Sequence, residues 1–241
     1  MALYRLFAEL KKRHPGLEIE SCASGGGRID LGIIDLVDRF WTSDNNDALE
    51  RQTMQRWTAQ FIPPELLGTH VGSDPGHQTG RHLSLAFRAA TALFGHAGLE
   101  RDLTSLKKEE LSLLKNWIDV YKAERDLLHS GSVVRMDYPD ASHYLHGVIS
   151  KDQSEAIFCF VQLRPIVASH APKITMRGLK ANSRYAITVL AAGGSAEFMA
   201  ITPPPWIESG ATMSGSELEN VGLPAPILRP ENALLLKIRE L

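Results

Sequence analysis

Residues 20–47 read ESCASGGGRIDLGIIDLVDRFWTSDNND, and they hold the clearest structural pattern in the N-terminal half of the chain. The preceding residues join them in the segment LEIESC, residues 17–22, which predicts a short strand that ends before three glycines. Asp30 is a suitable N-cap for a helix over LGIIDLVD, residues 31–38. RFWTS, residues 39–43, predicts a second buried strand. The stretch therefore predicts two strands joined by a helix.

Helices are predicted on both sides of this unit. Residues 3–10 carry apolar side chains at helical spacing, which HPG at residues 14–16 interrupts. Asp47 and Glu50 have the spacing of a capping box at the start of a helix that must end before Pro63. The N-terminal pattern is αβαβ. Further helices are expected over residues 81–94 and 105–128, the second with Ser105 as its N-cap.

The hydrophobic period changes near residue 130 from that of helices to that of strands. The expected strands cover residues 143–150, 155–163, 173–179, 184–190, 197–201 and 232–241. The sequence thus predicts an α/β domain at residues 1–130 and a small antiparallel β domain at 131–241. About two parallel strands are too few for a covered parallel sheet. We therefore expect other chains to complete the sheet, or the sequence to begin inside a fold.

Composition excludes several classes of function. The net charge of −2 provides no basic excess for binding a phosphate backbone, so nucleic acid is not expected as a partner. No apolar run approaches the roughly 20 residues that cross a bilayer, and the N-terminus lacks the charge order of a secretory signal. Cys22 and Cys159 lie far apart without a C-x-x-C partner, so reduced thiols are expected. We predict a cytoplasmic protein without a membrane partner or cofactor.

The glycine run and the histidines do not match the usual phosphate or metal motifs. Arg28 follows Gly25 to Gly27 where a P-loop needs Lys-Ser, and the G-x-G-x-x-G fingerprint is absent. A tight turn and a backbone that approaches a ligand both remain possible readings. The segment THVGSDPGHQTGRH, residues 69–82, spaces its histidines unlike any zinc motif, so a structural loop and no metal are predicted. Cys22 could be a nucleophile, but a buried or ligand-lining thiol is favoured.

The polar cluster after the second strand suits a sugar. Trp41 is expected to be an exposed aromatic, followed by Asp44, Asn45, Asn46 and Asp47. Sugar C–H faces stack on aromatic rings, hydroxyls bind carboxylates and amides, and an acid can protonate a leaving group. Asp47 is assigned as a helix cap, whereas Asp44 has no structural duty. Asp44 is either a catalytic acid or a solvated loop residue.

Four long segments resemble glycoside hydrolase family 36 α-galactosidases. They are ESCASGGGRIDLGI at 20–33, FWTSDNNDALERQ at 40–52, PPELLGTHVGSDPGHQTGR at 63–81 and SGSELENVGLPAPI at 214–227. The resemblance covers essentially the whole chain and implies the C-terminal portion of a (β/α)8 TIM barrel followed by an antiparallel β-sandwich. It also implies retaining hydrolysis of terminal α-galactosyl residues in sugars such as raffinose and melibiose.

The resemblance also assigns site residues. Asp44 is the first aspartate of the family's S-D-N-[TN]-D string, which implies the general acid/base. Trp41 occupies the place of a substrate-contacting tryptophan. The pocket-lining C-x-S-G stretch and its neighbour correspond here to Cys22, Ser24, Gly25 and Arg28.

A retaining mechanism needs a second carboxylate as the nucleophile. In this family it belongs to a K-W-D-x-N string, which this sequence lacks; KNWIDV at residues 115–120 is predicted to be helical. One hypothesis is an α-galactosidase fragment that works only with a companion chain that supplies the rest of the barrel. The alternative is an inactive remnant that binds sugars or another subunit. Either form could be a homo-oligomer.

Overall fold

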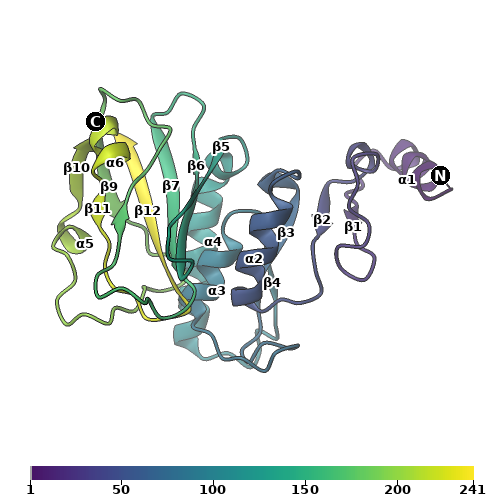
Figure 1. Cartoon of the computed structure of the whole chain (residues 1–241). Coiled ribbons are helices and arrows are strands. Elements are labelled where there is room, and N and C mark those ends of the chain that lie inside the picture. Colours follow the sequence, from purple (N-terminus) through teal and green to yellow (C-terminus); the bar gives the residue numbers. More distant parts are fainter. Residues whose placement is uncertain (1) are drawn as a thin grey trace. The chain divides into compact units, whose positions relative to one another are not determined.

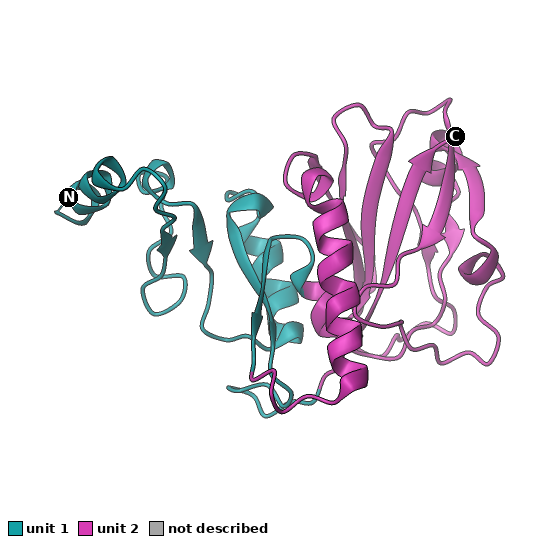
Figure 2. Ribbon diagram, turned by 180° about the vertical axis from the view of Figure 1, so that it is seen from behind, with its two compact units in different colours: residues 1–82, 92–101 teal, residues 83–91, 102–241 magenta. Residues whose placement is uncertain are grey.

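The computed structural model describes residues 2–241 and separates into two compact units. Unit 1 contains residues 1–82 and 92–101, and unit 2 contains residues 83–91 and 102–241 (Figure 2). The predicted domain boundary near residue 130 stays a prediction, because the compact units are not continuous in sequence: the chain passes from one unit to the other three times, after residues 82, 91 and 101.

Unit 1 is built on a parallel sheet whose strands lie in the order β1-β2-β3-β4 (Figure 1). Its elements are helix α1 (Ala2–Arg13), β1 (Glu20–Ser21), the 3-10 turn η1 (Ile34–Leu36), β2 (Arg39–Trp41), α2 (Ala48–Thr58), η2 (Pro64–Leu66), β3 (Leu67–Gly72) and β4 (His96–Glu100). The first helix and the two strands of the predicted αβαβ pattern are confirmed, and its second helix is absent. Four parallel strands are present, so the expectation of about two was wrong.

The predicted helix over residues 31–38 does not form; turns and the short η1 take its place. The Asp30 carboxylate accepts hydrogen bonds from the backbone N–H groups of Gly32 and Ile33 and from the Tyr4 hydroxyl. Aspartate that binds nearby backbone N–H groups favours turns over helix, and Gly32 lowers helix propensity further. Ile33 and Val37 then pack with Phe40, Ile62 and Leu67 in a small core.

Unit 2 is built on an antiparallel sheet of six strands, in the order β10-β9-β12-β7-β6-β5, and a second sheet of two strands, β11-β8. The strands are β5 (Ser132–Asp137), β6 (His143–Ile149), β7 (Glu155–Gln162), β8 (Lys173–Ile174), β9 (Arg184–Val189), β10 (Ala211–Ser214), β11 (Leu223–Pro224) and β12 (Asn232–Glu240). The helices are α3 (Leu85–Ala92, whose last residue belongs to unit 1), α4 (Lys108–Leu128), α5 (Trp206–Ser209) and α6 (Gly215–Asn220).

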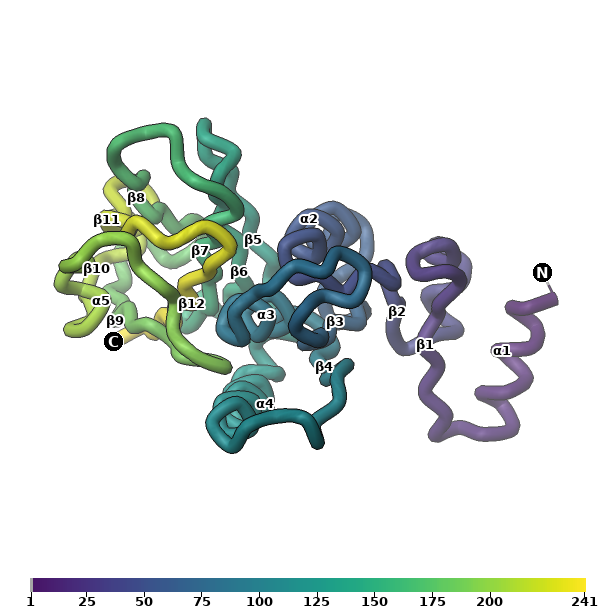
Figure 3. The backbone as a smooth tube through the Cα atoms, turned by 90° about the horizontal axis from the view of Figure 1, so that it is seen from below, coloured from purple at the N-terminus to yellow at the C-terminus, as the bar shows by residue number. Residues whose placement is uncertain are grey.

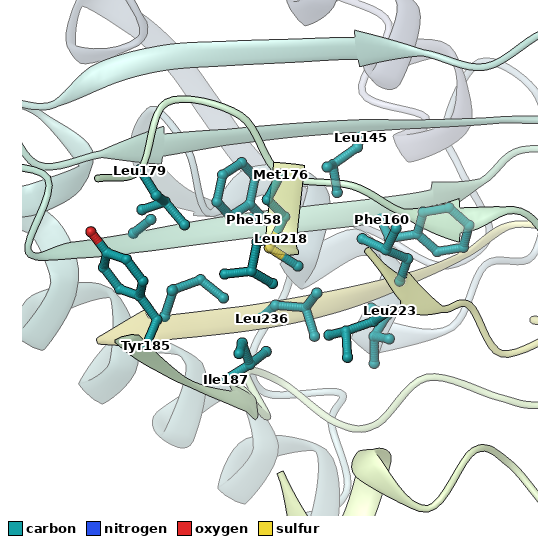
Figure 4. Close-up of a cluster of buried hydrophobic side chains, with 14 of the residues drawn as sticks. Leu145, Phe158, Phe160, Met176, Leu179, Tyr185, Ile187, Leu218, Leu223 and Leu236 are labelled. Carbon is teal, nitrogen blue, oxygen red and sulfur yellow. The ribbon is translucent and has the colours of Figure 1, made fainter. Parts of the chain in front are cut away.

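The main core of unit 2 lies between the two sheets. Phe158, Phe160 and Leu236 point from β7 and β12 toward Met176 and Leu223 (Figure 4). Helix α4 lies on the opposite face of the six-stranded sheet (Figure 3). Since both faces of β7 are covered, its side chains from Ala156 onward are buried, which explains its unbroken apolar run.

Several element predictions in unit 2 need correction. Residues 197–201 form no strand; Phe198 makes one isolated bridge to Leu228, and Met199 and Ile201 are exposed. Strand β5 was not predicted. Helix α4 begins at Lys108, and Ser105 does not cap it, because its hydroxyl donates to the Asp102 carbonyl.

The predicted fold class is confirmed: a portion of a parallel α/β barrel is followed by an antiparallel β domain. Across residues 2–241, no helix has the length and apolar character needed to cross a membrane.

Candidate functional site

The ends of β1 and β2 bring two loops of unit 1 together. Ser24 and Gly25 adopt left-handed conformations, with φ of 50° and 74°. A Cβ atom on Gly25 would lie 2.8 Å from Ser43 Cα and 2.9 Å from Asp44 N. The glycine loop thus packs directly against the turn that carries Asp44. Of the two readings of the glycine run, the tight turn is confirmed, and the turn lies beside the polar cluster.

The second loop presents Asp44 to solvent at the end of β2. Its backbone carbonyl accepts a hydrogen bond of 2.5 Å from Gln78 Nε2, and Asn46 N donates to Gln78 Oε1 at 3.3 Å. A small recess of about 30 Å³ lies here, lined by Asp44, Asn46, Ser73, Gly76, His77, Gln78 and Glu100. Asp44 is therefore an accessible carboxylate whose main chain is fixed by a neighbouring loop.

Asp47 has the structural duty that was predicted for it. The carboxylate accepts hydrogen bonds from Leu49 N and Glu50 N and caps α2. It also accepts a hydrogen bond from Thr79 Oγ1 and forms an ion pair of 2.8 Å with Arg81. Asp47 is 2% exposed. The buried aspartate is thus committed to structure, while the exposed Asp44 is available to a ligand.

Trp41 is buried, which contradicts the expectation of an exposed aromatic. Its exposed fraction is 8%, and the Arg51 guanidinium lies 4.1 Å from the ring centroid. The His70 ring packs at 4.4 Å between centroids, and Gly68 leaves room for the indole. The burial comes from these side-chain contacts, because Arg51 reaches the ring from α2 and His70 reaches it from β3. A sugar could therefore contact an edge of the indole rather than a free face.

Three residues of this site were not predicted from the sequence: Gln78 and Glu100, which line the recess, and Arg51 on α2. Arg51 is 2% exposed and donates hydrogen bonds to Thr42 Oγ1 at 2.6 Å, Ser43 O at 2.5 Å and Asn45 O at 2.7 Å. Burial lowers the pKa of Arg51 to about 10, against the opposing effect of nearby carboxylates that include Asp44. Arg51 therefore stays charged at neutral pH. A signal existed in its spacing, seven residues after Asp44 and so one helical turn past the Asp47 cap.

The remaining predicted residues lie on the glycine loop. Cys22 is exposed, so the expectation of a buried thiol was wrong, and a ligand-lining thiol stays a prediction. Ser24 is exposed as well. Arg28 turns back on its own loop, because its guanidinium donates to the Cys22 carbonyl at 3.0 Å. Ser21 Oγ in turn donates to the Arg28 carbonyl at 2.9 Å. Arg28 thus braces the loop that carries Cys22 and Ser24.

The histidines considered as metal ligands are dispersed. His70 Nδ1 lies 2.9 Å from Glu100 Oε2, which also accepts from Asn46 Nδ2 at 3.2 Å. His82 Nδ1 lies 3.4 Å from Asp74 Oδ1. Residues 2–241 contain no group of three or more His, Cys, Asp or Glu side chains arranged to hold a metal. The arrangement as a whole offers an exposed carboxylate, amides and a thiol to a polar, hydroxyl-bearing ligand.

Comparison with known proteins gives consistent matches over both units. The profile described as "Melibiase" matches residues 1–131, and that described as "Glycosyl hydrolase family 36 C-terminal domain" matches residues 144–231. An α-galactosidase of Escherichia coli is 41% identical over 240 residues, which are 98% of this chain and 34% of that protein.

The solved structures that resemble this chain are also α-galactosidases. The α-galactosidase of Lactobacillus brevis superposes with a TM-score of 0.85 at 33% identity, over 99% of this chain and 31% of that one. A variant of the α-galactosidase AgaA of Geobacillus stearothermophilus, solved with raffinose, gives a TM-score of 0.86 at 28% identity over the same shares. The chain thus spans about a third of the length of these relatives.

Proposed function

This chain belongs to the glycoside hydrolase family 36 α-galactosidases, and we propose that it supplies the acid/base side of a retaining α-galactosidase active site. Asp44 is the general acid/base. Cys22, Ser24 and Gly25 line the galactose pocket, Trp41 contacts the sugar by its edge, and Arg28 braces the loop. The substrates are terminal α-galactosides of the raffinose and melibiose type.

One observation carries the assignment of Asp44. The two aspartates of the cluster lie three residues apart, yet Asp47 is buried and fully engaged while Asp44 is exposed at the end of a parallel strand. In (β/α)8 enzymes the reacting groups lie at the carboxyl ends of the strands. An acid must reach the glycosidic oxygen, so only the accessible carboxylate of the pair can donate the proton.

The same mechanism requires a nucleophilic carboxylate about 5 Å from the acid/base. The family's K-W-D-x-N string is absent from residues 1–241. Glu100 lies in the same recess, but it is held by His70 and Asn46. We therefore propose that the nucleophile comes from a companion segment, and that these residues alone do not turn over substrate. A cytoplasmic location is part of the proposal.

The test is a chimaera in which residues 1–241 replace the matching region of the E. coli α-galactosidase. We expect the chimaera to hydrolyse raffinose. Asp44→Ala should lower kcat/KM for raffinose by about 10²- to 10⁴-fold, the usual contribution of a general acid/base. Asp74→Ala, a change at an exposed aspartate of the neighbouring loop, is the control and should retain most of the activity.

Azide distinguishes the acid/base from the nucleophile. Azide attacks the glycosyl-enzyme without base catalysis, on the face from which the acid/base normally acts. Asp44→Ala should thus regain turnover of an activated aryl α-galactoside with azide and release α-galactosyl azide. The β-anomer would make Asp44 the nucleophile and refute the assignment.

A further inference from the structure

Arg51 makes contacts that bracket Asp44 in the sequence. Its guanidinium donates hydrogen bonds to Thr42, Ser43 and Asn45. The residues immediately before and after Asp44 are therefore both held by the same buried side chain. The guanidinium is planar and its donors have a fixed geometry, so three simultaneous bonds restrict the position of the turn. These bonds fix the turn on the α2 side.

The same guanidinium also fixes the indole of Trp41, 4.1 Å away. Gly25 packs against the same turn, at the backbone of Ser43 and Asp44. Arg51 therefore contacts both β2, through Trp41, and the turn that follows it, and the glycine loop packs on that turn. The carboxylates of Asp44, Glu20 and Glu100 lie close enough to oppose the loss of the Arg51 charge on burial.

We propose that Arg51 is a positioning residue for the general acid: it holds the 42–45 turn so that the Asp44 carboxylate meets the glycosidic oxygen. The inference rests on the proposed function of Asp44. It adds a residue that contacts no sugar and acts through the geometry of the turn. A small misplacement of a reacting group costs on the order of 10²-fold in rate, which sets the expected size of the effect.

The kinetic test uses Arg51→Lys in the chimaera, with two substrates that differ in their leaving groups. Lysine keeps the charge but cannot form the three bonds. Raffinose needs protonation of its leaving oxygen, whereas dinitrophenyl α-galactoside does not. We expect kcat/KM to fall on the order of 10²-fold for raffinose and less than about threefold for the aryl substrate. Loss of folded enzyme would lower both values equally.

Arg88→Lys is the matched control, because Arg88 is also a buried arginine on a helix and donates to a backbone carbonyl, that of Leu83. It should lower both rates by the same factor. If Arg51→Lys lowered kcat/KM equally for both substrates, or did not lower it, the proposal for Arg51 would be overturned. The proposed function would still stand if Asp44→Ala had its expected effect.

A second measurement needs no activity and uses the 241-residue chain. Amide hydrogen exchange of residues 42–45 should accelerate at least about tenfold in Arg51→Lys, while that of strand β6 stays unchanged. Unchanged exchange at 42–45 would overturn the proposal. If the unsubstituted chimaera were inactive, the proposed function would fail, and the exchange result would still decide whether Arg51 holds the turn.

Discussion

Two separate features of the backbone require glycine at position 25. Its φ of 74° is a left-handed conformation, and a Cβ would strike the backbone of Ser43 and Asp44. Gly80 shares the conformation, with φ of 67°, but a Cβ there would meet nothing within 4 Å. The pair separates the cost of the conformation from the cost of the contact.

We expect Gly80→Ala to lower the free energy of unfolding by about 1 kcal/mol, the cost of a left-handed alanine. Gly25→Ala should cost at least about 2 kcal/mol, because the turn must also move. Urea unfolding of the two variants measures the difference. Equal losses would show that the contact between the loops is unimportant.

His143 makes the stability of unit 2 depend on pH. The residue is 4% exposed, its Nδ1 lies 2.9 Å from Ser142 Oγ, and its ring packs on Tyr138 and Phe160. Burial lowers the pKa of His143, and the Asp140 carboxylate opposes this only in part. A histidine with a depressed folded pKa binds fewer protons when folded than when unfolded. Stability therefore falls as the pH drops through the unfolded value of about 6.5.

The expected result is a lower urea midpoint at pH 5.5 than at pH 7.5, and a smaller difference in His143→Gln. Carboxylates with lowered pKa values, such as Asp140, lose their contribution at lower pH and leave this window largely to histidine. An identical difference in both proteins would exclude His143 as the source.

At the scale of elements, strands β3 and β4 were not predicted from the sequence. β3 and β4 contain Gly68, Gly72 and Gly98, which lower strand propensity and made the region look like a loop. Each glycine makes room for a site side chain: a Cβ would lie 3.2 Å from Trp41 Cε3, 2.8 Å from Asn46 Nδ2 and 2.6 Å from His70 Cδ2, respectively. Strand propensity therefore failed to predict β3 and β4, because packing of the site side chains requires glycine at these positions.

Other parts could be predicted because their signals are local. The alternation of strands, the cap at Asp47 and the apolar β7 follow from spacing and burial within one segment. The burial of Trp41 and the role of Arg51 depend on contacts between α2, β2 and β3, which no single segment reveals. The family resemblance by itself indicates Asp44, whereas the exposure of its side chain is a property of the fold.

Helix α4 is joined to the six-stranded sheet by a buried cation. Lys237 Nζ lies 2.6 Å from both Glu124 Oε2 on α4 and Glu155 Oε2 on β7, and the Lys237 side chain is 7% exposed. Removing Lys237 leaves Glu155 without this partner and Glu124 with only the Arg239 guanidinium at 4.0 Å.

Lys237→Met should therefore lower the free energy of unfolding by about 3 kcal/mol. Lys115→Met is the control, since Lys115 pairs with Asp119 on the exposed face of the same helix and should cost no more than about 0.5 kcal/mol. Similar losses in urea unfolding for the two variants would contradict the account of the buried group.

At the scale of the whole molecule, the parallel sheet has four strands, and the chain spans about a third of its relatives. An α/β barrel that forms a site from several strand ends needs eight. On the proposed function, one set of loops carries the acid, and a companion segment must bring the nucleophile to it. The two carboxylates of the mechanism are thus divided between this chain and the companion segment.

The most direct measurement is release of nitrophenol from an aryl α-galactoside by the purified 241-residue chain, alone and with the part of the E. coli α-galactosidase that lies outside the matched region. We predict no turnover by the chain alone, and turnover that depends on Asp44 once the companion segment is added. Turnover by the chain alone that Asp44→Ala abolishes would contradict the claim.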